Sequence, residues 1–351
     1  MRVKFLLILI SICFISIETD AQNLKSDFKI IGYYSINATM ETDTSQVPFD
    51  KLTHIMLAFI NPDASGNYNR NFDALVPFIK AAHRHDVKVL FSIGGGASPE
   101  EYHALLKQNK TRQGVINNLV SKVLQYDVDG VDVDLELGYV FGPNGMAISR
   151  SFPRENPAIP LADPNYGIFI MELAQALKSH NKLITVALPS RPADVVTQEV
   201  LSQFDFINIM SYDHTGQSRP DRPGHHSSYV DAMDDLDYYR FTLMVPKEKL
   251  ILGVPFYGRG FGPGLSDPVI AYMKYSDIVS TYAGAEWVDH WDLPNGYIMY
   301  YNGIPTIKNK TKLAKKEAAG IMIWELHYDA SGKKSLLNAI NEAVRDILNT
   351  Y

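Results

Sequence analysis

The chain has 351 residues, of which 46% are apolar and 21% charged, a composition typical of a globular protein with a substantial core. Its 33 basic and 39 acidic residues give a formal charge of -6, and no stretch concentrates the basic ones, which argues against nucleic acid and anionic membrane as partners. Cys13 is the only cysteine and lies near the N-terminus, so we expect a mature chain without disulfides or thiolate metal ligands.

The first 21 residues have the pattern of a secretory signal peptide. Arg2 and Lys4 precede an apolar run, and Ala21 is a small residue at a plausible cleavage site. A membrane anchor is the alternative, but the run is short for a bilayer and acidic residues end it. We therefore expect residues 1–21 to be removed and residues 22–351 to form one secreted domain, extracellular or periplasmic, with cell-surface attachment left open.

Beyond this segment, short apolar runs alternate with polar and amphipathic stretches, as in βα units. Eight such runs occur, at 28–34, 52–60, 87–93, 128–136, 183–189, 204–210, 250–256 and 320–326. Helical periodicity fills several of the gaps, for instance at 165–180, 229–244 and 334–348. Near-continuous apolar strands separated by helices predict a (β/α)8 TIM barrel. A doubly wound open sheet is the alternative, and the lack of a Gly-rich phosphate-binding turn after the first run counts against it.

Two connections are longer than a compact barrel requires. Residues 137–164 are rich in proline, and residues 257–319 separate the seventh and eighth strands. Both follow the C-terminal ends of strands, the face of a TIM barrel that carries the chemistry. We therefore expect both long loops to serve the functional site.

The fourth run contains the sequence DGVDVDLE, residues 129–136, which places four carboxylates in an apolar strand. Alternate residues of a strand point the same way, so Asp132, Asp134 and Glu136 share one face. Valines and a leucine occupy the other face, which would pack under the helices. The sequence therefore predicts a file of carboxylates up the barrel interior, with Glu136 at the mouth. The alternative is a misassigned strand whose acids are solvated.

Buried carboxylates either bind a cation or share protons. No matching set of histidines or further carboxylates accompanies them, so we predict no metal and no cofactor. Asp132 and Asp134, about 6.5 Å apart along a strand, are then expected to share a proton. Glu136 would have a raised pKa and act as a general acid, as in glycosidic bond cleavage. Because Asp134 rises from the strand of Glu136, it is badly placed as a nucleophile, and the carbonyl of a 2-acetamido group on the substrate can take that part.

These residues resemble the D-G-x-D-x-D-x-E signature of glycoside hydrolase family 18, the chitinases and their relatives. Further motifs agree in order along nearly the whole mature chain: GYY (32–34), SIGG (92–95), MSYD (210–213), YGR (257–259) and GIMIW (320–324). The resemblance implies a retaining hydrolase of β-1,4-linked N-acetylglucosamine that uses substrate-assisted catalysis.

The resemblance also implies roles for individual residues. Glu136 would protonate the leaving oxygen and later activate water. Asp134 would orient the acetamido group beside its proton-sharing neighbour Asp132, and Tyr212 would hold the acetamido carbonyl. The implied residues of substrate binding or of support for the acidic file are Tyr33, Phe59, Ser92, Met210, Asp213, Tyr257, Arg259 and Trp324. We expect a monomer whose partner is an oligo- or polysaccharide containing N-acetylglucosamine.

The chain departs from the family pattern at positions that affect substrate choice. Gly96 stands where many chitinases have a tryptophan, so one aromatic platform for an outer sugar is missing. The segment after the seventh strand, with Trp287 and Trp291, is expected to be too short for the full α+β insertion of some members. Soluble chito-oligosaccharides or N-glycan cores are therefore favoured over crystalline chitin. The alternatives are an endo-β-N-acetylglucosaminidase acting on N-glycans and a lectin-like relative that binds glycans without cleaving them.

Overall fold

The computed structural model describes residues 27–36, 42–96, 101–135, 139–141, 147–149, 164–190, 196–216, 222–263 and 271–348. The expected signal peptide (1–21), Glu136 and most of the proline-rich loop lie outside these ranges. The division into a signal peptide and one domain therefore stays a prediction.

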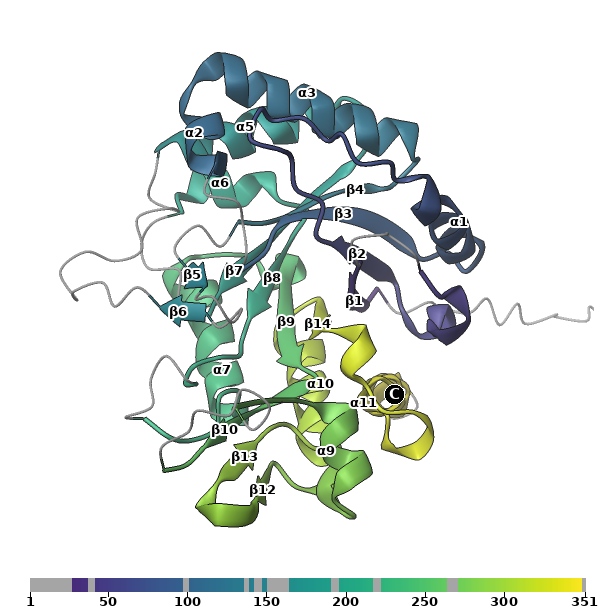
Figure 1. Cartoon of the computed structure of the whole chain (residues 1–351), viewed down its shortest axis with the longest axis vertical. Coiled ribbons are helices and arrows are strands. Elements are labelled where there is room, and N and C mark those ends of the chain that lie inside the picture. Colours follow the sequence, from purple (N-terminus) through teal and green to yellow (C-terminus); the bar gives the residue numbers. More distant parts are fainter. Residues whose placement is uncertain are drawn as a thin grey trace, which may run out of the picture.

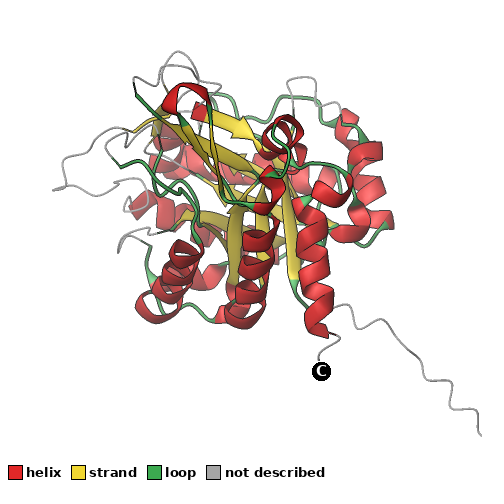
Figure 2. Ribbon diagram, turned by 90° about the horizontal axis from the view of Figure 1, so that it is seen from below, coloured by secondary structure: helices red, strands yellow, loops and turns green. Residues whose placement is uncertain are grey.

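Eight parallel strands close into a barrel in the spatial order β1-β14-β9-β8-β7-β4-β3-β2. Figures 1 and 2 show the helices around these strands, as in a TIM barrel. The predicted fold is thus confirmed, and each of the eight apolar runs overlaps one barrel strand. The strands are β1 (Lys29–Ser35), β2 (His54–Ala58), β3 (Lys88–Gly94), β4 (Gly130–Asp134), β7 (Leu183–Pro189), β8 (Phe206–Met210), β9 (Leu250–Pro255) and β14 (Gly320–Trp324).

The helices cover the outside of the barrel, and the three predicted helical stretches overlap α5, α7 and α11. The helices are α1 (Val76–Arg84), α2 (Glu101–Lys107), α3 (Asn109–Gln125), α5 (Pro164–Lys178), α6 (Gln198–Gln203), α7 (Tyr229–Asp237), α9 (Tyr275–Thr281), α10 (Ile304–Glu317) and α11 (Leu336–Leu348). A capping box starts α7, in which the Ser228 side chain accepts from the backbone of Asp231 at 3.0 Å. A π-helical turn, Tyr238–Thr242, continues this helix.

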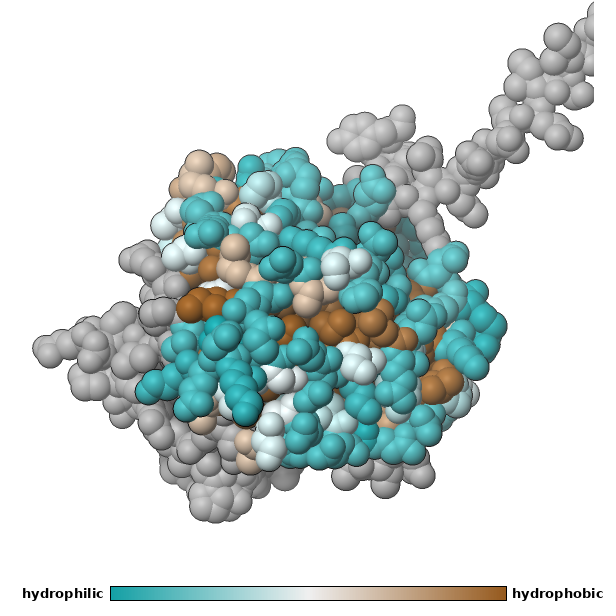
Figure 3. All heavy atoms as spheres, turned by 90° about the horizontal axis from the view of Figure 1, so that it is seen from above, coloured by the Kyte–Doolittle hydropathy of each residue, from teal (hydrophilic) through white to brown (hydrophobic). Residues whose placement is uncertain are grey.

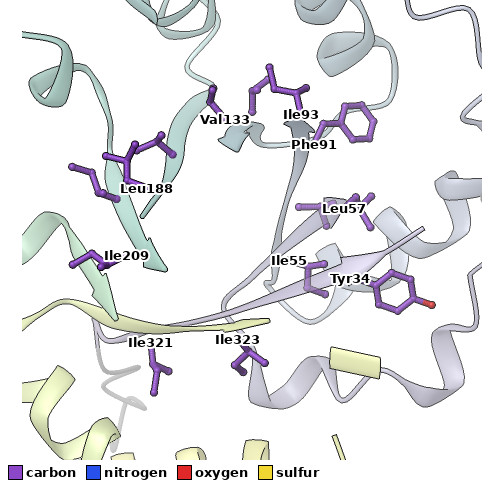
Figure 4. Close-up of a cluster of buried hydrophobic side chains, with 14 of the residues drawn as sticks. Tyr34, Ile55, Leu57, Phe91, Ile93, Val133, Leu188, Ile209, Ile321 and Ile323 are labelled. Carbon is purple, nitrogen blue, oxygen red and sulfur yellow. The ribbon is translucent and has the colours of Figure 1, made fainter. Parts of the chain in front are cut away.

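The apolar core has two parts because each strand presents two faces. The larger part lies between strands and helices, and Figure 4 shows members such as Ile55, Phe91 and Ile321 on the strands that supply them. The smaller part fills the barrel itself and comprises Ile31, Tyr33, Met56, Ala58, Leu90, Ala187, Phe206, Ile251 and Met322. The barrel interior is therefore filled by side chains.

The connection between β9 and β14 is a small α+β insertion rather than an open loop. β10 (Tyr257–Phe261), β11 (Tyr272–Lys274), β12 (His290–Asp292) and β13 (Ile298–Tyr300) form an antiparallel sheet in the order β11-β10-β13-β12. It lies beside α9 at one end of the molecule (Figure 1). The segment expected as a long loop thus contains a small sheet and a helix, and the expectation that it is too short for the full insertion of some family members stays a prediction. Antiparallel pairing of strands as short as three residues satisfies their backbone groups, and apolar residues such as Met299 are fully buried.

The loop after β4 contains a short hairpin of β5 (Tyr139–Phe141) and β6 (Ala147–Ser149) in its described part. Among the described residues, no helix has the length and apolarity needed to cross a bilayer. The face in Figure 3 is largely hydrophilic, with apolar side chains gathered in a narrow band.

Candidate active site

Strand β4 divides its side chains by alternation. Val131, Val133 and Leu135 belong to the core under the helices. Asp132 and Asp134 have the opposite parity and are buried, with exposed fractions of 0% and 2%. Glu136, the next residue of that parity, lies outside the described residues. The strand thus carries two buried carboxylates on its barrel side.

The Asp132 carboxylate accepts hydrogen bonds from four strands. Oδ2 accepts from the Tyr33 hydroxyl on β1 at 2.7 Å and from Ser92 Oγ on β3 at 2.8 Å. Oδ1 accepts from Thr185 Oγ1 on β7 at 2.6 Å and from Asn208 Nδ2 on β8 at 3.2 Å. A buried carboxylate needs such partners, and every one of these donors is uncharged. No group of three or more potential metal ligands occurs in the part of the chain that the structure describes.

Burial raises the pKa of Asp132, and the hydrogen bonds from Thr185, Tyr33, Ser92 and Asn208 oppose that rise. The pKa of Tyr33 is raised well above its usual value by burial and by the negative charges of Asp132 and Asp134. Tyr33 therefore remains protonated and able to donate at any physiological pH.

The glycines after β3 hold the backbone of Asp134. Gly94 has φ +103°, and a Cβ there would lie 2.2 Å from the carbonyl oxygen of Asp134. Gly95 donates its N–H to that oxygen at 2.6 Å, and a Cβ on Gly95 would collide with the Phe59 ring. Asn61 binds Gly94 on both sides, accepting from its N–H at 2.7 Å and donating to its carbonyl at 2.9 Å. These glycines therefore allow the backbone after β3 to approach the end of β4 closely.

The end of β8 carries Tyr212 into the mouth of the barrel. Tyr212 continues the parity of Asn208 and Met210, and both Met210 and Tyr212 pack against the inner cluster. The Tyr212 hydroxyl lies 3.9 Å from Met322 Sδ. Gly253 on β9 makes room for the ring, because a Cβ there would lie 3.1 Å from Tyr212.

Asp213, the next residue, forms a two-pronged ion pair with Arg259 of the insertion. Arg259 Nε and Nη2 donate to the two carboxylate oxygens at 2.8 and 2.6 Å. The Arg259 guanidinium also lies over the rings of Tyr257 and Tyr272, at 5.2 and 4.9 Å. Burial would raise the pKa of Asp213, but the charge of Arg259 and hydrogen bonds from His226 and Arg259 lower it. This pair ties the barrel mouth to the insertion.

Trp324, the last residue of β14, is partly buried against the inner cluster. Its ring stacks on Phe59 with centroids 5.8 Å apart and a 20° interplanar angle. Tyr33 packs on it at 5.4 Å. Aromatic side chains thus pack around Tyr33, the residue that donates to Asp132.

Most of the predicted site residues meet in two groups at the C-terminal ends of the strands. Tyr33, Ser92, Phe59 and Trp324 surround the acidic file; Tyr212, Asp213, Tyr257 and Arg259 lie together at the end of β8 and the start of the insertion. Thr185, Asn208 and Asn61 were not among the predicted site residues. For the first two a signal existed, since Thr185 is the one polar residue of 183–189 and Asn208 lies between two isoleucines of the run 204–210.

The chain matches the family model "Glycosyl hydrolases family 18" over residues 29–329. Probable chitinase 2 of Drosophila melanogaster is 24% identical over 326 residues, which cover 79% of this chain and 64% of the relative. A chitinase-like effector of Moniliophthora perniciosa is 28% identical over 263 residues, covering 68% of this chain and 57% of the relative. The chain therefore spans less than two thirds of the length of these curated relatives.

Solved chitinase structures share the fold. ChiB from the chitin utilization locus of Flavobacterium johnsoniae is 32% identical with a TM-score of 0.75, covering 91% of this chain and 94% of that one. A chitinase from Bacteroides thetaiotaomicron is 28% identical with a TM-score of 0.71, covering 90% and 96%. A class V chitinase mutant from Nicotiana tobaccum, in complex with NAG4, is 18% identical with a TM-score of 0.71, covering 90% and 98%, a likeness of fold.

Proposed function

The chain belongs to glycoside hydrolase family 18, and from this premise we propose that it is a secreted hydrolase of β-1,4-linked N-acetylglucosamine, acting on chito-oligosaccharides or accessible chitin. The relatives named as chitinases support this substrate class, and the tobacco enzyme is bound to NAG4.

The observation that carries the proposal is the pair of buried carboxylates on β4 below a mouth lined by aromatic side chains. Both oxygens of Asp132 already accept hydrogen bonds from uncharged donors. Asp132 is therefore suited to be a fixed neighbour of Asp134 and not to hold a cation. We assign Asp134 the task of orienting the substrate acetamido group. Tyr212 would donate to the acetamido carbonyl, and Trp324 would lie under the sugar ring.

We assign Glu136, next in the alternation, the role of general acid and base. Its carboxylic acid protonates the glycosidic oxygen while the acetamido carbonyl oxygen attacks the anomeric carbon from the opposite face. The glycosidic bond breaks, the alcohol leaves, and an oxazolinium ion forms. The Glu136 carboxylate then takes a proton from water, and the water oxygen attacks the anomeric carbon and opens the oxazolinium ring. Two inversions give overall retention.

The spacing of the two acids is the reason to propose attack by the substrate itself. Glu136 is two residues after Asp134, so if the strand alternation continues, both acids would approach the sugar from the same side. A protein nucleophile must instead lie on the opposite face of the sugar ring from the acid. A 2-acetamido group supplies that attack from within the substrate. A 2-hydroxy analogue, such as a cellulose oligomer, should therefore not be turned over.

The test is a product profile of the wild type on chitin oligomers beside a high-mannose glycoprotein. We expect oligomer cleavage with retained β-configuration, and its loss in Glu136→Gln. Asp129→Asn is the matched control: this acid opens the same motif but accepts from Val89 N–H at 2.8 Å and contacts His83 at the other end of the strand.

The alternative outcomes identify the alternative functions. Release of glycan from the glycoprotein with intact oligomers would indicate the endo-β-N-acetylglucosaminidase. Oligomer binding without cleavage by either wild type or Glu136→Gln would indicate a glycan-binding relative. Secretion is tested separately, by N-terminal sequencing of exported protein, which should begin at Gln22.

A further inference from the structure

A second buried polar cluster lies behind the β8 end that carries Tyr212 and Asp213. Its members come from the residue after β8, the loop before α7, α7, the residue before the N-cap of α10, and α10 itself. They are Ser211, His226, Ser227, Asp235, Asn302 and Lys310, and none is more than 1% exposed. Below we call this set the Lys310 cluster. The proposed chemistry does not use it.

Lys310, on α10, is fully buried, and its amine has three acceptors within hydrogen-bond distance. Its Nζ donates to the Ser227 carbonyl and to Ser227 Oγ, each at 2.7 Å, and to Asn302 Oδ1 at 2.9 Å. Burial lowers the pKa of Lys310 to about 7, against the attraction of Asp231, Asp289 and Asp235. Placing an ammonium in the interior opposes folding, so its complete set of acceptors indicates an ordered structure around it.

Ser227 connects Lys310 to Ser211, the residue before Tyr212. Because Ser227 Oγ accepts from Lys310, its own proton is directed to the Ser211 carbonyl, to which it donates at 2.6 Å. Ser211 Oγ in turn donates to Asp235 Oδ2 at 2.6 Å, and His214 Nε2 lies 3.0 Å from the same oxygen. Ser211 is therefore held through both its backbone and its side chain.

The residue after Tyr212 is held by the neighbour of Ser227. His226 Nδ1 lies 3.4 Å from the backbone nitrogen of Asp213 and 3.3 Å from its carboxylate. The His226 carbonyl accepts from the His214 N–H at 3.1 Å. The two sequence neighbours of Tyr212 are thus both held by the segment His226–Ser227. Lys310 in turn clamps this segment, because its amine is hydrogen-bonded to Ser227.

We propose that Lys310 is a positioning residue for the proposed hydrolysis: by clamping Ser227 it fixes Ser211 and so sets the place of Tyr212 at the barrel mouth. It acts through Ser227 and does not touch the sugar. The proposal rests on the proposed function for its kinetic readout.

Two variants break the clamp at different points, and a third is the matched control. Ser227→Ala removes the link to Ser211 together with one acceptor of Lys310, and leaves Lys310 the Ser227 carbonyl and the Asn302 amide oxygen. Lys310→Met removes the whole clamp. Thr311→Val is the control, since Thr311 is equally buried on the same helix but donates only to Ile307 O within that helix, at 2.8 Å.

We expect kcat/KM on chito-oligosaccharides to fall about 10- to 100-fold in Ser227→Ala and Lys310→Met, the loss typical of a catalytic group displaced by about 1 Å. Thr311→Val should keep wild-type turnover. Melting temperatures identify any variant that does not fold. A folded Ser227→Ala with wild-type kcat/KM would overturn the proposal, whatever the fate of Lys310→Met.

A double-mutant cycle with Tyr212→Phe separates positioning from a general loss of stability. If Lys310 acts through Tyr212, Ser227→Ala should cost little more once the Tyr212 hydroxyl is gone. An equal fold-loss in both backgrounds would contradict the proposal.

A crystal structure of Ser227→Ala gives a readout independent of activity. We expect Ser211, Tyr212 and Asp213 to be displaced from their wild-type positions while β8 stays in place. An unmoved segment would refute the positioning role even if the wild type proved inactive. Wild-type inactivity on oligomers, in contrast, would count against the proposed function alone.

Discussion

Tyr33 on β1 and Asp132 on β4 are 99 residues apart in the chain, yet the tyrosine hydroxyl donates to the carboxylate at 2.7 Å inside the barrel. Neither strand lies next to the other in the sheet, because β2 and β3 separate them. This hydrogen bond therefore crosses the barrel interior. Its acceptor is the Asp132 carboxylate, whose pKa is raised by burial.

The raised pKa of Asp132 makes stability depend on pH. An acid whose pKa is higher in the folded than in the unfolded state contributes stability below its unfolded pKa, and that contribution is lost as the pH rises through the folded pKa. Asp132→Asn removes the ionisation. Its melting temperature, relative to wild type, should therefore improve as the pH rises from about 4, the ordinary range of an aspartate, to neutral.

Asp213 is the opposite case, because its pKa is lowered. The ionised Asp213 contributes stability at pH values above its pKa in the unfolded chain. That contribution is lost as the pH falls through its pKa in the folded protein. Asp213→Asn should thus be less stable than wild type at neutral pH, with a deficit that shrinks in strong acid. Melting curves of both variants over one pH series test the two signs together; parallel curves would contradict both assignments.

Gly94→Ala should impair both folding and activity. The positive φ alone costs about 1–3 kcal/mol for a residue with a Cβ, and the new Cβ would also press on the Asp134 carbonyl. Gly284→Ala separates the two effects, since Gly284 has φ +89° with nothing near its Cβ position. We expect denaturant unfolding to show a larger loss for Gly94→Ala, and loss of turnover for that variant alone.

Trp324 should report the bound sugar. The chain has only three tryptophans, so variants that keep one each, with phenylalanine at the other two positions, are simple to make. Titration with chito-oligosaccharide should change the fluorescence of the Trp324-only protein and leave that of the Trp287-only protein unchanged, because Trp287 is 60% exposed on the insertion. A response of Trp287 alone would place the sugar elsewhere.

Arg259→Lys should not behave as a conservative change. Lysine keeps the charge near Asp213 but cannot reproduce the paired N–H donors or the stacking on Tyr257 and Tyr272. We expect kcat/KM to fall about tenfold, equivalent to roughly 1.4 kcal/mol, because Asp213 adjoins Tyr212. Steady-state kinetics beside Lys274→Arg, an exposed cation next to Tyr328, provide the comparison.

The barrel was predictable because its strands are buried on both faces and stand out as apolar runs. The insertion was not, since its short strands, such as Tyr272–Lys274, show no clear period and form only by pairing with one another. A three-residue strand has too few positions for alternation to be detected.

The acidic file was predictable from alternation within one strand, and the family resemblance implied two of its partners, Tyr33 and Ser92. Thr185 and Asn208 stand out as polar residues on apolar strands, but their link to Asp132 could not be predicted, because they reach it only when the barrel closes. The role of Asn61 could not be predicted for a related reason. Its partners are backbone groups of Gly94, and a sequence motif gives no information on such contacts.

The four donors of Asp132 have a consequence for how the protein folds. Two come from the N-terminal half-barrel, β1 and β3, and two from the C-terminal half, β7 and β8. Only the closed barrel supplies all four donors, so the carboxylate loses its contact with water and gains its full donor set in the same step. This coupling favours joint assembly of the two halves and makes the folding of the whole barrel more cooperative.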